Sequence, residues 1–212
     1  MRITVLGAGG GVGREVVAQA LAAGHEVTAV VRDRVRARLD GHDRLDTAAA
    51  DALDPASLLP AVKGADAVVS ALGGRGGASE PTTVCERGAR AAVEAMRTAE
   101  VRRIVAISAA TVTAEGDGPF TRFAVKPLLT RVLRHPRADS LRMEEVLAGS
   151  GLDWTVLRPP MLLDRPRTGR YRMSDGANVR GGLRIGRADV ADAALAVLTD
   201  PARFRTAVGV AY

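Results

Sequence analysis

The sequence has few of the residues that build metal sites, disulfides and aromatic stacking surfaces. Its 212 residues include one cysteine, three histidines and only 3% aromatic residues. One cysteine cannot form an internal disulfide and is typical of a reducing compartment, so we expect a cytoplasmic protein. The scattered histidines and the lone cysteine supply no zinc ligand set, so we expect no metal site. With so few aromatic residues, the core has to be built mainly from Ala, Val and Leu.

Long apolar runs are also missing. No run of about 18 apolar residues is present, so we expect neither a membrane span nor a membrane partner. The chain enters an apolar segment by residue 3, which fits neither a signal peptide nor a transit peptide. The formal net charge is +6, but the arginines are spread along the whole chain. A phosphate-bearing cofactor and an arginine-rich coding bias therefore explain the charge better than a nucleic-acid partner does.

The first 33 residues have the pattern of a strand, a glycine-rich turn, a helix and a second strand. The strands are predicted at Arg2 to Leu6 and Glu26 to Val31, with helical periodicity between them from Arg14 to Ala23 and a terminating Gly24. The turn is GAGGGVG, residues 7–13, and its order between strand and helix is that of a dinucleotide-binding unit. A flexible glycine turn without a ligand is the alternative interpretation.

Glycine is needed in this turn for physical reasons that differ from position to position. Gly7 permits the tight turn, Gly10 or Gly11 lets the backbone approach a pyrophosphate, and Gly13 lets the helix pack on the strand. Gly7 and Gly9 also give the turn a Gly-x-Gly spacing, beside the spacing of Gly7, Gly10 and Gly13. The helix N-terminus then offers free N–H groups and the positive end of its dipole to phosphates.

The residue after the second strand indicates which coenzyme is used. An acidic residue there binds the ribose 2′-hydroxyl of NAD, whereas an arginine accommodates the 2′-phosphate of NADP. Arg32 holds this position and is followed by Asp33. A guanidinium is suited to bidentate phosphate contact, so we favour NADP and keep NAD, through Asp33, as the alternative.

The rest of the chain continues the alternation of strands and helices. We expect a single domain over residues 1–212, of the α/β class, with a doubly wound and mostly parallel Rossmann sheet in the order 3-2-1-4-5-6 plus a C-terminal strand. The later strands are predicted at residues 45–50, 65–72, 102–108, 153–157 and 207–210. Helices are predicted at residues 55–62, 81–99, 139–148 and 190–198, the first with Asp54 as its N-cap and the last with Asp189.

Strand ends supply further candidate residues, because ligands bind at the carboxyl edge of such sheets. Asp51 follows the third strand, where it can accept a hydrogen bond from an adenine amino group. Arg75, in the glycine-rich loop after the fourth strand, is an anion-binding candidate or an exposed arginine without a partner. Ser108 ends the fifth strand, either as a hydrogen-bond donor to a reduced acceptor or as a cap of the next turn. The acceptor pocket is expected from loops 73–80, 109–136 and 162–182.

Nearly the whole chain resembles the atypical short-chain dehydrogenase/reductase (SDR) superfamily. GxxGxxG at the N-terminus is similar to the atypical and extended members. The stretches VTAVVRD (27–33), PTTVCERGARAAVEAM (81–96), LRMEEVLAGSGLDWTVLRPP (141–160), TGRY (168–171) and RADVADAAL (187–195) resemble the flavin reductase/biliverdin reductase B branch and, more loosely, NmrA-like proteins.

The resemblance implies an NADPH-dependent reductase of flavins, quinones, azo dyes or tetrapyrroles. It implies that the pyrophosphate lies on the glycine turn and the 2′-phosphate on Arg32. It implies that the adenine contacts Asp51 and Ala52, and that the ribose contacts Ala71, Leu72 and Gly73. It also implies that the nicotinamide lies beside Ser108 and residues 158–161, which include Pro159 and Pro160.

Two departures from the family's sequence pattern narrow the range of substrates that we expect. Tyr-dependent SDR enzymes place a tyrosine four residues before a lysine, but Arg122 stands four residues before Lys126. Met161 replaces the histidine that follows Pro-Pro in tetrapyrrole-reducing relatives, which argues against biliverdin. A conjugated acceptor needs less help from a protein acid than a carbonyl does. We therefore expect an NADPH-dependent reductase of a flavin or quinone-like acceptor, or alternatively a non-catalytic NADP(H)-sensing regulator.

Overall fold

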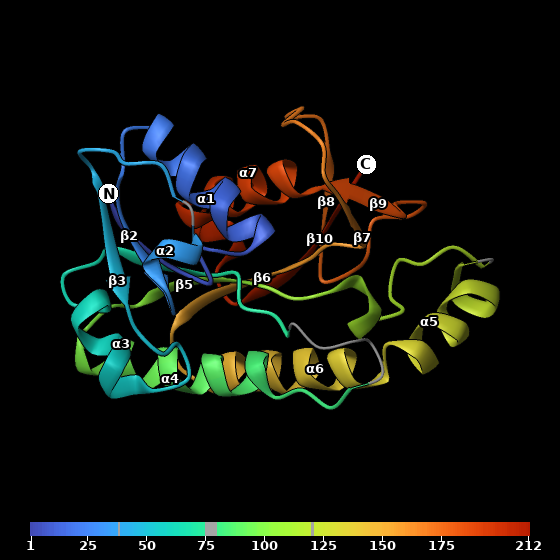
Figure 1. Ribbon diagram of the computed structural model, residues 1–212. Helices are drawn as coiled ribbons and strands as arrows, with labels where there is room; N and C mark the ends of the chain where they lie inside the picture. The colour runs from blue at the N-terminus through green and yellow to red at the C-terminus, as the bar shows by residue number, and fades with distance from the viewer. Residues whose placement is uncertain (38, 75–79, 120) are drawn as a thin grey trace.

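A mostly parallel sheet forms the centre of the molecule and lies between two layers of helices (Figure 1). The computed structural model describes residues 1–37, 39–74, 80–119 and 121–212. In the order β3-β2-β1-β4-β5-β6-β10-β8, the eight strands of the sheet span Leu45–Ala49, Glu26–Val31, Arg2–Leu6, Ala67–Ser70, Arg103–Ile107, Asp153–Arg158, Thr206–Ala211 and Arg172–Asp175.

The predicted strand order 3-2-1-4-5-6 with a C-terminal strand is confirmed. Three strands were not predicted. One of them, β8, comes from the segment 162–182 and pairs antiparallel with β10. The other two, β7 (Met161–Leu163) and β9 (Arg184–Gly186), lie at the two ends of this segment and form a second, two-stranded parallel sheet. The segment 162–182, predicted as a loop, is therefore joined to the C-terminal strand of the main sheet.

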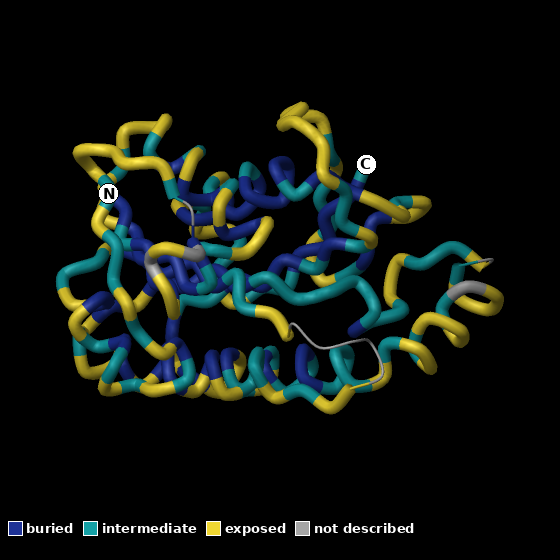
Figure 2. Tube along the Cα trace, viewed as in Figure 1, coloured by how far each residue is buried: buried dark blue, intermediate teal, exposed yellow. Residues whose placement is uncertain are grey.

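Each face of the sheet buries its own apolar core. Helices α1 (Gly11–Ala22) and α7 (Arg187–Leu198) cover one face, and α3 (Pro55–Val62), α4 (Val84–Thr98) and α6 (Arg134–Ala148) cover the other (Figure 1). Neighbouring residues of a strand enter opposite cores, because strand side chains alternate. On β1, Val5 packs in the α1/α7 core and Leu6 in the α3/α4/α6 core. Figure 2 shows the buried residues gathered on the sheet and on the inner faces of the helices.

Helix boundaries follow local capping where it is present. Asp54 caps α3 as predicted, since its carboxylate accepts from the backbone N–H groups of Ala56 and Ser57. The prediction that Asp189 caps the last helix is wrong: α7 begins at Arg187, and Gly186 is its N-cap. Asp189 lies inside the first turn and is fully buried, because its carboxylate binds groups from distant segments instead.

The segment between β5 and α6 extends away from the body of the molecule (Figure 1). It contains the turn η1 (Ala110–Val112), the π-helical turn η2 (Thr121–Val125) and α5 (Lys126–Val132), which buries none of its described residues. Two short elements complete the structure, α2 (Arg34–Ala37) and η3 (Pro201–Arg203). Within the described part of the chain, no helix combines the length and apolar character needed to cross a bilayer.

Candidate functional site

A cleft of about 290 Å³ opens at the carboxyl ends of β1, β4 and β5. It lies where the strand order reverses between β1 and β4, which is the usual ligand position in a doubly wound sheet. Its lining residues come from the N-terminus of α1, the segment after β4, the ends of β5 and β7, and the starts of α4, α6 and α7. Segments from the whole length of the chain therefore meet at this edge.

The predicted site residues are distributed around this edge as follows. Those that line the cleft are Gly11, Val12, Ala71, Leu72, Gly73 and Ser108. Those that shape the turn between β1 and α1 are Gly7, Gly9, Gly10 and Gly13. The remaining residues follow strand ends: Arg32 comes after β2, Asp51 and Ala52 come after β3, and Pro159 and Pro160 come after β6.

The glycine turn is a cradle in which side chains would not fit. Gly7 has a positive φ of 74°, and a Cβ there would lie 2.8 Å from the carbonyl oxygen of Ala71. A Cβ on Gly13 would lie 2.2 Å from the carbonyl oxygen of Gly7. Gly10 is the N-cap of α1, and no side chain in the described part of the chain caps this helix. The turn and the uncapped helix start fit a dinucleotide pyrophosphate, which backbone N–H groups would bind.

The residues at the ends of β2 and β3 differ in their local bonds. Arg32 directly follows β2 and is exposed. Asp33 Oδ1 accepts a hydrogen bond from the backbone N–H of Val35, in the first turn of α2. Asp51 Oδ1 accepts from the N–H of Leu53, while the Asp51 N–H donates to Ser57 Oγ. Both aspartates thus accept hydrogen bonds within local turns, whereas Arg32 is exposed to solvent.

Ser108 is held by a charged pair that sequence reasoning did not find. Its hydroxyl donates to Oε1 of Glu144 at 2.6 Å, and Arg158 binds both oxygens of the same carboxylate, at 3.1 and 2.5 Å. The side chains of Glu144 and Arg158 are each 13% exposed. An ion-paired carboxylate only accepts, so the hydroxyl proton of Ser108 is committed to Glu144. Ser108 does not cap the following turn.

Lys126 and the two tyrosines, which are candidate acids elsewhere in the chain, are each paired within the protein. Lys126 forms an ion pair with Asp117 at 2.5 Å and donates to the carbonyl of Ala110 at 3.2 Å, so it anchors the loop after β5. Tyr171 donates to Asp192, and Tyr212 donates to Asp189. Burial and these aspartates raise the pKa of both phenols above the ordinary value.

Asp139 is a second side chain whose role only the fold reveals. It is fully buried on α6, lines the cleft, and accepts hydrogen bonds from the N–H groups of Cys85 and Glu86 and from the hydroxyl of Thr82. It therefore caps α4 from another helix. Burial, together with the charge and hydrogen bond of Asp139, raises the pKa of the Cys85 thiol to about 12. The thiol thus stays protonated, and Cys85 packs as a small, partly buried residue against the α3/α4/α6 core.

Arg187 is the basic residue of the cleft that the sequence did not single out. It is the first residue of α7, and its side chain crosses the start of α1: a Cβ on Gly11 would lie 2.6 Å from Cδ of Arg187. The RADVADAAL segment was notable only for its resemblance, because nothing near Arg187 in sequence indicates a partner at residue 11. The prediction for Arg75 falls within residues 75–79, which lie outside the described residues.

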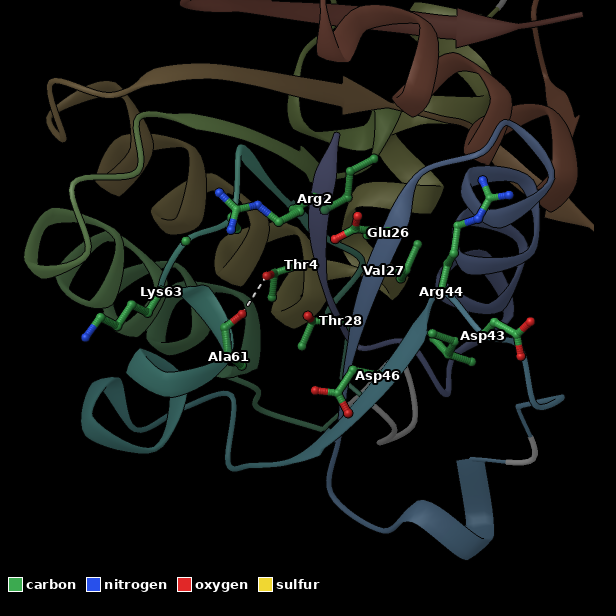
Figure 3. A pocket seen from close by; sticks show the side chains of 14 residues that line it. Arg2, Thr4, Glu26, Val27, Thr28, Asp43, Arg44, Asp46, Ala61 and Lys63 are labelled. Atoms are coloured by element: carbon green, nitrogen blue, oxygen red, sulfur yellow. Dashed lines mark hydrogen bonds between the residues drawn. The ribbon is translucent and has the colours of Figure 1, made fainter.

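A second hollow, of about 340 Å³, lies at the opposite edge of the sheet, beside the amino ends of β1, β2 and β3 (Figure 3). Basic and acidic side chains line it together, including Arg2, Arg44, Glu26 and Asp46. Thr4 donates to the carbonyl of Ala61 there, as the dashed line shows. Because parallel sheets bind ligands at the carboxyl edge, we place the functional site in the first cleft and not here.

Known proteins resemble this chain over most of its length. A family model described as NAD(P)H-binding matches residues 7–201. An uncharacterized chloroplastic protein of Arabidopsis thaliana is 30% identical over 211 residues, covering 96% of this chain and 74% of that protein. The uncharacterized sugar epimerase YhfK of Bacillus subtilis is 28% identical over 209 residues, covering 94% and 89%. A wide-type short-chain dehydrogenase/reductase of Veillonella parvula, solved with NADP, shares the fold with a TM-score of 0.82, 22% identity, and coverage of 100% and 94%.

Proposed function

The chain belongs to the NAD(P)H-binding family, and from this premise we propose that it is an NADPH-dependent oxidoreductase that transfers hydride to a flavin, a quinone or a similar conjugated acceptor. It would be an atypical SDR that works without a Tyr-x-x-x-Lys pair. The one cysteine is consistent with work in a reducing cytoplasm.

The observation that carries this proposal is that the described residues lining the cleft include no side chain of the kind that usually protonates a carbonyl oxygen. Among the described residues that line it there is no tyrosine, lysine or histidine. Ser108 is the lining hydroxyl at the end of β5, and its proton is held by Glu144. Reduction of a carbonyl forms an alkoxide, for which a positioned acid is worth about 10²–10⁴-fold in rate. A site without such an acid is better suited to an acceptor that stabilises the incoming charge itself.

The chemistry then depends on proximity and orientation. Bound NADPH would supply the hydride, and a conjugated ring would spread the negative charge while solvent provides the proton. The glycine turn and Arg32 would hold the coenzyme. Ser108 would use its remaining lone pairs to accept a hydrogen bond from an N–H group at the reacting end. Pro159, Pro160 and the segments at 109–136 and 162–182 would shape the acceptor side.

Preference for NADPH rests on Arg32 and on the local role of Asp33. A guanidinium in solvent at the end of β2 can bind a 2′-phosphate with two parallel hydrogen bonds. Asp33, the residue that would favour NAD, directs one carboxylate oxygen to the N–H of Val35. These contacts support NADPH over NADH as the coenzyme.

The test is a turnover assay with two substrate panels. Purified protein and NADPH are mixed with flavins and quinones in one panel and with aliphatic ketones and nucleotide sugars in the other, and the absorbance of the reduced nicotinamide is followed. We expect saturable oxidation with members of the first panel only, and a higher KM with NADH than with NADPH. Turnover confined to the second panel would contradict the proposal and would favour an epimerase-like activity, as the name of one relative suggests.

The alternative is an NADP(H)-sensing regulator that performs no chemistry. The same observation favours it, because Ser108, Lys126 and both tyrosines are each paired within the protein. Calorimetry separates the two functions. Coenzyme binding together with no oxidation across the flavin and quinone panel would replace the reductase by the sensor, whereas no binding of either coenzyme would contradict both.

A further inference from the structure

Arg187 joins α1 and α7, two of the helices that begin at the cleft. Its Cδ and Nε lie 2.6 and 2.8 Å from the position that a Cβ on Gly11 would take, so the side chain lies directly over the first residue of α1. Gln19 of α1 donates to the carbonyl of Ala188 at 2.8 Å, which fixes the start of α7 against α1. The packing of the start of α7 against α1 therefore places the Arg187 guanidinium beside the glycine turn.

The partner of Arg187 is an exposed carboxylate. Nη1 of Arg187 lies 2.5 Å from Oδ1 of Asp164, whose side chain is 90% exposed, while that of Arg187 is 30% exposed. Asp164 directly follows β7, and the pairing of Leu163 with Gly186 in the small sheet brings it next to Arg187. No other hydrogen bond from this guanidinium to a described residue is present, so most of its five N–H donors remain available.

The charge balance of the cleft makes Arg187 distinctive. Among the described residues that line the cleft it is the only lysine or arginine, whereas Glu80 and Asp139 are acidic. A pyrophosphate in the same cleft adds further negative charge, and Arg187 is the cation that the described lining residues offer to balance it. The N–H groups at the start of α1 provide only partial positive charge.

We infer that Arg187 binds the pyrophosphate of the coenzyme and exchanges Asp164 for a phosphate oxygen when the coenzyme enters. The arginine is already placed over Gly11, so binding requires only a change of partner at the guanidinium. Asp164 then keeps the cation in position before binding and competes with the ligand for it. This inference rests on the coenzyme-binding part of the proposed function and adds a residue from the opposite end of the chain to it.

Calorimetric titration of the full-length protein with NADPH and NADH tests the role of Arg187. We expect Arg187→Ala to weaken both coenzymes by about 10- to 100-fold, the effect of losing a hydrogen bond to a charged group. The matched control is Arg184→Ala, an exposed arginine of β9 that does not line the cleft, and it should bind like the wild type. Binding of 2′-AMP, which has no pyrophosphate, should be the same in Arg187→Ala as in the wild type.

Asp164→Asn tests the exchange of partners. It removes a competing anion, so we expect coenzyme binding about 2- to 5-fold tighter than in the wild type. Weaker binding would overturn the exchange. Unchanged affinity of Arg187→Ala for both coenzymes would overturn the role of Arg187, whereas a wild-type protein that binds neither coenzyme would instead contradict the proposed function. If Arg187→Ala does not fold, Arg187→Lys replaces it, with a smaller loss of affinity for both coenzymes expected and no loss contradicting the inference.

Discussion

Ser108 and Glu144 share a 2.6 Å hydrogen bond in which the serine hydroxyl is the donor. Glu144 comes from α6, and its carboxylate is also bound by Arg158 at the end of β6. Because the carboxylate is ion-paired, Ser108 has no proton to offer to a ligand and presents only lone pairs to the cleft.

Replacing the two residues separates the hydrogen bond from the ion pair. Ser108→Ala removes one hydrogen bond to a charged group, so we expect the free energy of unfolding to fall by about 1.5–3 kcal/mol and turnover of a conjugated acceptor to fall about tenfold. Glu144→Gln leaves the mostly buried guanidinium of Arg158 without its charge partner and should cost about 3–5 kcal/mol. Urea denaturation measures both. If Glu144→Gln costs no more than Ser108→Ala, the ion pair does not hold this corner of the cleft.

Two alanine substitutions in the glycine turn should have opposite outcomes. A Cβ at Gly13 would lie 2.2 Å from the backbone oxygen of Gly7, so we expect Gly13→Ala to destabilise the protein by about 3 kcal/mol and to abolish coenzyme binding. A Cβ at Gly9 would lie 3.6 Å from Ala37, an ordinary contact, so Gly9→Ala should fold like the wild type. Thermal denaturation and coenzyme titration compare the pair. Equal tolerance at both positions would contradict the packing of α1 on this turn.

Arg32 should determine the choice between the coenzymes. Arg32→Ala removes a charged contact worth about 1.5–3 kcal/mol, so NADPH should bind about 10- to 100-fold more weakly while NADH is hardly affected. Arg131→Ala, which removes an exposed arginine of α5, is the control and should change neither affinity. Equal losses for both coenzymes would show that Arg32 does not bind the 2′-phosphate. The contrast with Arg187→Ala, expected to weaken both, separates the two phosphate positions.

Asp189 should make folding stability sensitive to acid. Burial by itself would raise its pKa, but hydrogen bonds from Tyr212, Gly169 and Thr168 lower it below the ordinary value of 3.8. The ionised group therefore stabilises the fold above pH 3.8, and this contribution is lost as the pH falls through the lowered pKa.

Asp189→Asn provides the measurement. The amide keeps the shape but presents N–H groups to donors, so we expect a loss of about 2–4 kcal/mol at neutral pH. Urea denaturation is measured from neutral to acidic pH. The difference in urea midpoint between the wild type and Asp189→Asn should become smaller as the pH falls below the ordinary aspartate pKa. Asp46→Asn, at an exposed position on β3, is the control. A gap that stays constant over this range would show that Asp189 does not titrate with folding.

The features that the sequence predicted are those set by residues close together in the chain. The glycine turn, the strand before it and the helix after it lie within residues 2–22, and the cap of α3 by Asp54 joins residues three apart or closer. The parallel order of the sheet followed from the alternation of strands and helices, because right-handed crossovers leave few arrangements. Predicted helix ends were least accurate where no local cap was present, as at α6 and α7.

The sequence by itself determined a dinucleotide-binding α/β fold, because hydrophobic periodicity and glycine conformation act over a few residues. Only the tertiary structure decided which side chains reach the cleft: Glu144 meets Ser108 across 36 residues, Asp139 caps α4 across 54, and Arg187 lies on Gly11 from the opposite end of the chain. Such pairs depend on how separate helices pack onto one sheet, and no local pattern encodes that packing. The same reason explains why Asp189, with the sequence signature of a cap, instead binds Thr168, Gly169 and Tyr212 in the interior.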